Sequence, residues 1–182
     1  MRPNRLPAFN ARSLSSVVLS PSRKLDSGAV DRNRFAANHH RMSEIIYPRS
    51  PRETMDGWMH LPRYIDKIRL HLAGKLHPDY RDNFGKGFDE KWLKAAGVTQ
   101  EQMLEVVKNS ITDGEVCDWV RKNVKHSAAE KAAHAQSMLD YPKADDAAMQ
   151  ARLKMRKEQA AISHRDDIQS FVDFIDADEK RA

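Results

Sequence analysis

Charged side chains crowd the start of one predicted helix, and these are the groups in the sequence best placed to do chemistry. An imidazole, guanidinium groups and a carboxylate within reach of one another could bind an anion or exchange protons. The candidate polar site comprises His60, Arg63, Asp66 and Arg69, with Lys67 beside them. Their types and spacing specify neither a substrate nor a reaction, so catalytic residues stay unassigned.

A glycine-flanked lysine extends this candidate site. Lys86 stands between Gly85 and Gly87, so its ammonium and the backbone N–H groups of the loop could converge on a phosphate or another anion. The loop lacks the glycine and the hydroxyl residue that a P-loop places around its lysine. We therefore add Lys86 to the candidate anion site, with a plain flexible loop as the alternative.

The helix that carries the first group gives the strongest helix signal in the sequence, within Trp58–Leu76. Pro62 suits a first helical turn, and Gly74 suits a helix end. On a wheel of about 100° per residue, the apolar side chains share one narrow stripe. The stripe consists of Leu61, Ile65, Ile68, Leu72 and Leu76.

Arg69 lies at the edge of this stripe, where a structural role competes with anion binding. Its stem could cover the core while its guanidinium pairs with a carboxylate. Asp66 is the nearest carboxylate in the same helix. Asp176 lies beside the apolar stripe of the last predicted helix, which Ser163 would cap. We expect a structural ion pair between Arg69 and Asp176 across these two helices.

Capping boxes mark three successive helices in the middle of the chain. In each box a hydroxyl can accept the N–H three residues on, while the Gln or Glu there reaches back. The pairs are Thr99 with Gln102, Thr112 with Glu115, and Ser127 with Glu130, and they predict helices over 100–109, 113–124 and 128–139. Residues 88–96 predict a shorter helix. The charged stretch 144–162 shows no single apolar face, so it is either a solvated connector or a contact with another subunit.

No segment shows the alternation of apolar and polar residues that is typical of a strand. The sequence therefore predicts an all-α fold, a compact bundle of about six helices. The strong helices at its two ends each carry a narrow apolar stripe that needs a partner. We expect these two helices to be neighbours.

Positive charge is concentrated at the beginning of the chain. Residues 1–41 hold eight Arg or Lys and two Asp, a net charge of +6, whereas the whole chain carries +5, which leaves −1 for residues 42–182. We expect a disordered basic leader over residues 1–41 and a single helical domain over 42–182. The leader could reflect a start assigned too early, ahead of Met42, or a targeting segment, or a tail that contacts nucleic acid or an anionic membrane.

The composition argues against several classes of site. Cys117 is the single cysteine, which excludes an internal disulfide and a cysteine-based zinc site. The acidic residues near the C-terminus lack the order of an EF-hand loop and no HExxH motif occurs, so we expect no metal and no cofactor. The near-neutral body argues against nucleic-acid binding by the folded part. Without an apolar run of about 18 residues, we expect no membrane span and a cytoplasmic protein.

Three segments, in this order, resemble a known family. They are SPRETMDGWMHLPRYIDKIRLHLAGKLHPDY, NFGKGFDEKWL and the terminal RDDIQSFVDFIDADE. Over most of residues 48–180, the chain resembles small bacterial cytosolic proteins grouped as domain of unknown function number five thousand and sixty-nine. The resemblance implies a mainly helical domain and an intracellular setting, and it carries over no catalytic residues.

The sequence favours a non-enzymatic interaction or regulatory module, with an unknown protein partner or self-association, because most charged residues resemble solvated helix faces and caps. One alternative is a small enzyme, or an anion- or phosphate-binding protein, that uses the cluster at residues 60–69 with Lys86. A concave pocket joining these groups would favour that alternative. Another alternative is nucleic-acid association through the leader. In that case a chain that begins at Met42 would no longer bind nucleic acid.

Overall fold

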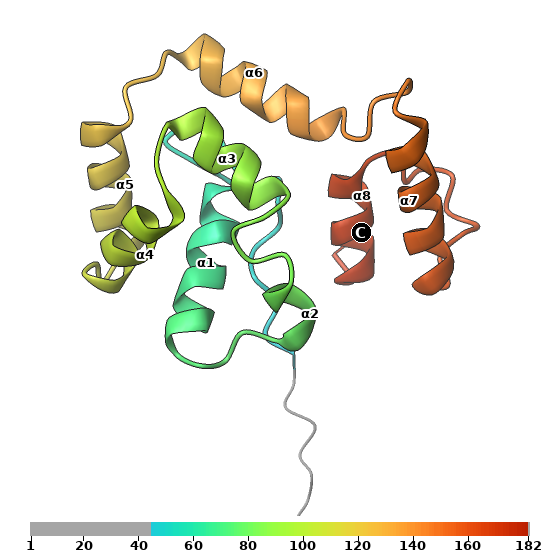
Figure 1. Ribbon diagram of the computed structural model, residues 1–182, viewed down its shortest axis with the longest axis horizontal. Coiled ribbons are helices and arrows are strands. Elements are labelled where there is room, and N and C mark those ends of the chain that lie inside the picture. Colours follow the sequence, from blue (N-terminus) through green and yellow to red (C-terminus); the bar gives the residue numbers. More distant parts are fainter. Residues whose placement is uncertain (1–44, 182) are drawn as a thin grey trace, which may run out of the picture. The chain divides into compact units, whose positions relative to one another are not determined.

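The computed structural model describes residues 45–181, so the predictions for the leader lie outside the described residues. The described chain is mainly helical (Figure 1). Its elements are β1 (Thr54–Met55), β2 (Trp58–Met59), α1 (Leu61–Leu72), α2 (Pro78–Arg81), α3 (Phe88–Ala96), α4 (Gln100–Lys108), α5 (Asp113–Asn123), α6 (Ala128–Leu139), α7 (Ala147–Gln159) and α8 (Phe171–Asp178). The predicted helical class is confirmed, whereas residues 45–181 form eight helices rather than about six. None of these helices is long and apolar enough to cross a membrane.

Two small elements go beyond the sequence prediction. The helix α2 forms inside a predicted loop, because Pro78 fits its first turn and the side chain of His77 accepts the N–H of Asp79. The strands β1 and β2 pair antiparallel around Asp56 and Gly57, which both have positive φ. Asp-Gly is a hairpin signal, but strands of two residues are too short to show an alternating pattern.

The three predicted capping boxes are present and determine where α4, α5 and α6 begin. They start at Thr99, Thr112 and Ser127. In each box the hydroxyl accepts the backbone N–H three residues on, and the Gln or Glu side chain there accepts the N–H of the cap. Because both groups are satisfied locally, these helix starts follow from the sequence alone.

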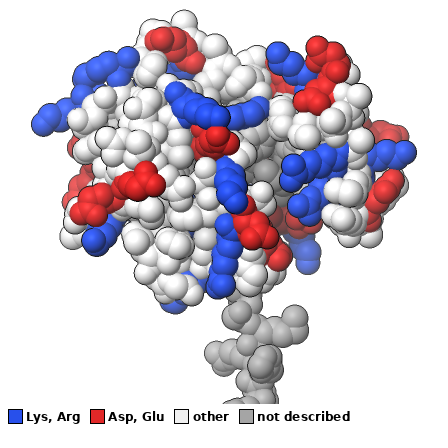
Figure 2. Space-filling view, in the orientation of Figure 1, with Lys and Arg blue, Asp and Glu red and all other residues white. Residues whose placement is uncertain are grey.

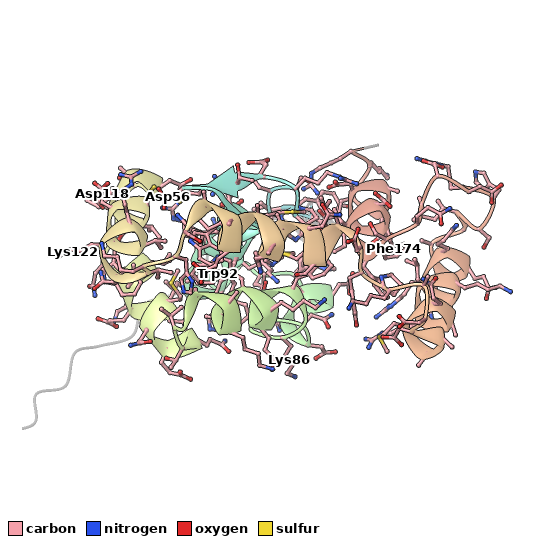
Figure 3. All side chains as sticks on the ribbon, turned by 90° about the horizontal axis from the view of Figure 1, so that it is seen from above. Asp56, Lys86, Trp92, Asp118, Lys122 and Phe174 are labelled. Atoms are coloured by element: carbon pink, nitrogen blue, oxygen red, sulfur yellow. The ribbon has the colours of Figure 1, made fainter. Side chains whose placement is uncertain are left out.

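The helix α6 connects the two sides of the helical arrangement. Figure 1 shows it running from α5 toward α7 and α8. It contacts β2, α3 and α8, while α1 packs on α4 and β1, and α7 packs on α8. Seen from above in Figure 3, α3 and α6 lie side by side. This pair of neighbouring helices forms the walls of the cavity described below.

The main apolar core forms around α1. Ile65 and Ile68 of the predicted stripe are fully buried, whereas Leu72 is largely exposed and ends the buried part of the helix. Trp58 and Trp92 meet edge to face with ring centroids 6.0 Å apart (Figure 3 labels Trp92). Aromatic pairs prefer this geometry, so the hairpin is fixed firmly against α3.

The last helix begins later than the sequence predicts. Ser170, rather than Ser163, caps α8, and the residues between them form turns and bends. Val172 packs against Met59 and Met138 in a second apolar cluster. The apolar side of α8 therefore covers β2 and α6 instead of the stripe of α1 that the sequence predicts as its neighbour.

Candidate functional site

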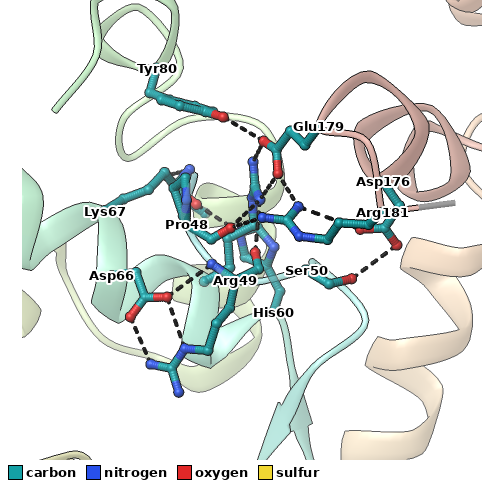
Figure 4. Close-up of polar contacts among 12 residues, drawn as sticks. Pro48, Arg49, Ser50, His60, Asp66, Lys67, Tyr80, Asp176, Glu179 and Arg181 are labelled. Carbon is teal, nitrogen blue, oxygen red and sulfur yellow. Dashed lines mark hydrogen bonds and ion pairs between the residues drawn. The ribbon is translucent and has the colours of Figure 1, made fainter. Parts of the chain in front are cut away.

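The candidate residues of α1 and its cap bind different charged partners (Figure 4), and Arg63 also donates to the backbone oxygen of Arg49 at 2.8 Å. His60 and Lys67 bind Asp89, Arg63 binds Glu179, Asp66 binds Arg49, and Arg69 binds Asp113. Each partner is a carboxylate or guanidinium of the chain itself. Lys86 is exposed at the start of α3 (Figure 3) and joins none of these networks within the described residues.

His60, Lys67 and Asp89 form what we call the buried triad. Asp89 is fully buried, and His60 and Lys67 expose 1% and 6% of their surface. Oδ1 of Asp89 lies 2.7 Å from Nε2 of His60, and Oδ2 accepts hydrogen bonds from Nζ of Lys67 and, at 3.0 Å, from the N–H of Gly85. Both carboxylate oxygens are thus paired, which is the condition under which a charge is tolerated in a protein interior.

The glycine loop binds an internal carboxylate, that of Asp89, in place of an external anion. Gly85 has a φ of 73° and donates its N–H to this carboxylate. The positive φ favours a glycine here, and a Cβ at Gly85 would displace the end of the Gln100 side chain, whose Oε1 would lie 1.9 Å away. The loop therefore closes over an internal carboxylate, and the side chain of Lys86 remains at the surface.

His60 combines an uncommon backbone conformation with a neutral ring. Its φ of 73° lies in the left-handed region that few residues with a side chain adopt. Burial lowers the pKa of the ring to about 4, although the hydrogen bond to Asp89 acts in the opposite direction. Burial would likewise raise the pKa of Asp89, but the charge of Lys67 and the hydrogen bonds from His60 and Lys67 together hold that pKa low. At neutral pH the ring of His60 is therefore neutral. Burial also lowers the pKa of Lys67, an effect that the charge of its partner Asp89 opposes.

The low pKa of His60 predicts a pH dependence of stability. Unfolding restores the ordinary pKa of about 6.5. Between that value and the folded value of about 4, the unfolded chain binds a proton that the folded chain does not. The free energy of unfolding should therefore fall as the pH falls through this range, by about 1.4 kcal/mol per pH unit. Denaturant unfolding at a series of pH values measures this slope.

His60→Asn tests the assignment, because asparagine tolerates a positive φ. This variant should lose most of the slope, whereas His164→Asn, at an exposed position, should keep it. A smaller slope should remain in His60→Asn, since burial also lowers the pKa of His134. A slope of wild-type size in His60→Asn would show that another group is responsible.

A second network, which we call the C-terminal clasp, consists of Arg63, Tyr80, Glu179 and Arg181. Arg63 donates from Nη1 and Nη2 to the two oxygens of Glu179, at 2.8 and 2.5 Å, and the hydroxyl of Tyr80 donates at 2.6 Å. Arg181 completes the set. Burial would raise the pKa of Glu179, but Arg63, Tyr80 and Arg181 together lower that pKa. The clasp is thus a fully paired buried carboxylate, and it joins the end of α8 to α1 and α2.

The ion pair of Arg69 differs from the predicted one. Nη1 of Arg69 lies 2.5 Å from Oδ1 of Asp113 at the start of α5. Asp176 instead accepts a hydrogen bond from Ser50 at 2.9 Å and pairs with Arg52 at 3.3 Å. The physical reason is that α8 packs its apolar side on α6, which turns Asp176 toward the segment that precedes β1.

Arg49 holds two carboxylates, although the sequence gives no sign of this role. Nε and Nη2 of its guanidinium each lie 2.8 Å from an oxygen of Asp66, and Nη1 lies 2.7 Å from Asp113. Asp113 therefore bridges Arg49 and Arg69. These side chains remain between 23% and 34% exposed, so each pair contributes about 1 kcal/mol or less. Their role is to hold the entry segment against α1 and α5.

A cavity of about 450 Å³ lies between α3 and α6, and we call it the α3–α6 groove. Its lining includes Trp58, Lys91, Lys94, His126, His134 and Ser137. A second cavity, of about 310 Å³, lies between α7 and the segment before α8. Neither cavity contains a residue of the predicted polar site. The groove is therefore a candidate site that the sequence analysis missed.

The face that α6 presents to the groove follows helical spacing. Glu130, His134 and Ser137 lie one above the other, and His126 precedes them by one turn. This spacing is visible in the sequence and is the signal by which these residues could be found. It does not reveal that α3 lies opposite, because that depends on how the hairpin and α6 pack.

His134 has an unsatisfied hydrogen-bonding group in the groove wall. It is 7% exposed, and its Nε2 is buried without a hydrogen-bond partner among residues 45–181. Burial lowers the pKa of the ring, while a hydrogen bond to the backbone of Met59 opposes this effect. The neutral ring therefore leaves one lone pair without a partner. Nδ1 of His60 is also buried and unpaired in the described chain, but His60 lines neither cavity.

Lys91 forms no ion pair with a carboxylate within the described residues. Its Nζ lies 3.5 Å from the centre of the Tyr141 ring, a contact that favours the ammonium. Burial, and then the charge of Lys143, lower its pKa.

The carboxylate Glu130 also lines the groove, where it lies 3.4 Å from His126. Lys94, unlike Lys91, pairs with a carboxylate, that of Glu90, at 2.5 Å. Lys91 is therefore the cation in the groove that is available to an anion.

The acidic residues near the C-terminus face arginines. Asp173 pairs with Arg52 at the surface, and Asp176 pairs with the same guanidinium. Across residues 45–181, no group of three or more His, Cys, Asp or Glu is placed to hold a metal ion. These carboxylates act as ion-pair partners of the entry segment.

One family model matches residues 45–181, with the description Domain of unknown function (DUF5069). No curated protein matches the sequence. Neither comparison names a ligand or a reaction, so the argument for a function rests on the geometry of the groove and of the polar networks.

Proposed function

This chain belongs to the DUF5069 family, as the resemblance in its sequence predicts, and we propose that it is a binding module that holds a small organic anion in the α3–α6 groove. The ammonium of Lys91 carries the proposal. A half-buried cation without a carboxylate partner is stabilised by an anion placed beside it. The volume of about 450 Å³ suits a molecule of one ring with a carboxylate or phosphate group.

The remaining lining supports the same class of ligand. Trp58 is buried beneath the groove, and its ring lies edge-on to those of His126 and His134, with centroids 5.5 and 5.4 Å away. Lys94 adds a second ammonium one turn along α3. Apolar and aromatic walls with a few fixed polar groups are typical of small-molecule sites.

The buried triad and the C-terminal clasp support a structural role for the cluster at residues 60–69. An external anion would have to displace Asp89 or Glu179, which are already buried and paired. Removing a paired charge from such a site is costly. We therefore place ligand binding in the groove and propose a binding role rather than a reaction at the cluster.

Lys91→Met should weaken anion binding about tenfold, because it removes a charged hydrogen-bond donor. Phenylacetate and phenyl phosphate serve as probes of the full chain, and isothermal titration calorimetry gives the Kd. Lys94→Met should cause a smaller loss, since Glu90 already pairs with that lysine. Lys108→Met is the matched control, because Lys108 is a helical lysine outside the groove that also pairs with a glutamate, Glu105.

Two results would exclude this function. One is the absence of binding of either probe at millimolar concentration. The other is equal affinity of Lys91→Met and Lys108→Met for a probe that does bind, since the anion would then lie elsewhere.

The other functions that the sequence suggests stay predictions. Nucleic-acid association through residues 1–41 falls outside the described residues. On the body, Figure 2 shows Lys and Arg interspersed with Asp and Glu over one face, and this mixture offers no broad basic surface there. A protein partner, self-association and a cytoplasmic location remain compatible with a ligand-binding module.

A further inference from the structure

Lysine and glutamate side chains bring charges of both signs to the α3–α6 groove. Lys91 and Lys94 come from α3, and Glu130 comes from α6. Lys94 is already paired with Glu90, whereas Lys91 has no carboxylate partner in the part of the chain that the structure describes. Glu130 contacts a histidine, His126, but forms no ion pair with a lysine or an arginine there. The lining therefore holds one cation and one anion that lack a partner of fixed opposite charge.

These two charges lie at opposite ends of the groove. The start of α3 packs on the end of α6, since the rings of Phe88 and Tyr141 have centroids 5.9 Å apart. Lys91 belongs to this end, because its Nζ lies 3.5 Å from the centre of the Tyr141 ring. Glu130 lies in the first turn of α6, and Leu139 ends that helix nine positions later. At a rise of about 1.5 Å per residue, this is a distance of roughly 13 Å along the helix.

The carboxylate of Glu130 is ionised and open to a ligand. Hydrogen bonds from the backbone and then the side chain of Ser127 lower its pKa. Both bonds, at 2.7 and 2.8 Å, use Oε2, and the side chain remains 60% exposed. The start of α6 contributes only about half a positive charge, so a net negative charge remains. Because a carboxylate has about four acceptor positions, Glu130 can accept a further donor.

We propose that the ligand of the groove is an extended zwitterion, with an acid group at Lys91 and an amino group at Glu130, at opposite ends of the molecule. This inference rests on the proposed function and names the class of ligand. Such a ligand complements both charges of the lining at once. Trp58, beneath the groove, offers an apolar floor to the part between them. An α-amino acid, with both charged groups on one carbon, is too short to reach both ends.

Two isomeric zwitterions and one acid test the inference on the full chain. In para-(aminomethyl)phenylacetate the amino group lies across the ring from the acid group, whereas the isomer phenylalanine carries both on one carbon. The acid para-methylphenylacetate has nearly the shape of the first molecule but no amino group. Isothermal titration calorimetry at neutral pH should show para-(aminomethyl)phenylacetate binding about three- to fivefold more tightly than each of the other two. This is the effect expected of one added ion pair at an exposed carboxylate.

Glu130→Gln removes the charge and keeps the helix start, because glutamine holds the same position in the capping box of Thr99 and Gln102. This variant should lose the preference for the extended zwitterion and retain the affinity for para-methylphenylacetate. Glu115→Gln, at the corresponding position in the capping box of α5, is the matched control and should keep the preference.

Equal affinity for the three ligands, with binding that still depends on Lys91, would overturn this inference and leave the proposed function standing. A preference that persists in Glu130→Gln would also overturn it. The same holds if phenylalanine binds as tightly as its isomer, a comparison that needs no variant. No binding of any of the three ligands would overturn both the inference and the proposed function.

Discussion

Asp89→Ala is expected to lower the free energy of unfolding by about 3–5 kcal/mol, the usual cost of removing one partner from a buried ion pair. The substitution takes from Lys67 the carboxylate that balances its charge, and Lys67 is itself almost completely buried. It also removes the acceptor that His60 and the N–H of Gly85 share. Urea unfolding, followed by tryptophan fluorescence, measures the loss.

A double-mutant cycle separates the ion pair from the other contacts of Asp89. Lys67→Met in the Asp89→Ala background should recover most of the loss, since an apolar pair of similar volume often replaces a buried ion pair without cost. Additive losses would contradict the coupling of the two charges. Asp118→Ala is the control at an exposed pair with Arg121 (Figure 3 labels Asp118), and its effect should stay within about 0.5 kcal/mol.

Glu179→Ala should be almost as destabilising, at about 3 kcal/mol or more. It leaves the guanidinium of Arg63 buried without its bidentate partner and removes the acceptor of Tyr80. Acetate in the tens of millimolar should raise the Tm of this variant, because a free carboxylate can enter the space that the side chain vacates. Differential scanning calorimetry with and without acetate measures both effects.

Asp167→Ala provides the comparison for Glu179→Ala. Asp167 also pairs with an arginine, Arg165, but its side chain is 63% exposed. Its removal should cost less than about 1 kcal/mol, and acetate should not raise the Tm of this variant. A response to acetate in Asp167→Ala or in the wild type would show that the salt acts generally and not at the clasp.

The sequence predicts those parts of the fold that are determined by neighbouring residues. The capping boxes at Thr99, Thr112 and Ser127 act over three residues, and the helix starts that they predict are confirmed. The predicted start of the last helix, at Ser163, is wrong because Ser163 and Ser170 both satisfy the local rule for a cap. Ile168 is buried ahead of the helix, and local rules contain no information about such tertiary packing.

The polar contacts are harder to predict, because each charged residue has several acceptable partners. Arg69 could reach any carboxylate that folding brought near the edge of the stripe. The partner is Asp113, since α5 approaches α1 through α4. The sequence does not predict the groove either, because the groove depends on how distant helices pack. Lys91 and His134 each look ordinary on their own helix, and their chemistry appears when α3 and α6 are set side by side.

The contacts of the C-terminal clasp join the two ends of the described chain, and this affects the order in which the protein folds. Arg181 donates to the backbone oxygen of Pro48 across 133 positions of sequence, so these contacts close almost the whole described chain into a non-covalent ring. Closing a loop of this length costs much conformational entropy but offers little reward until most of the helices are in place. The ring should therefore close late in folding. Once the ring is closed, it couples the two ends, so that neither α1 nor α8 can detach without breaking the contacts of the clasp.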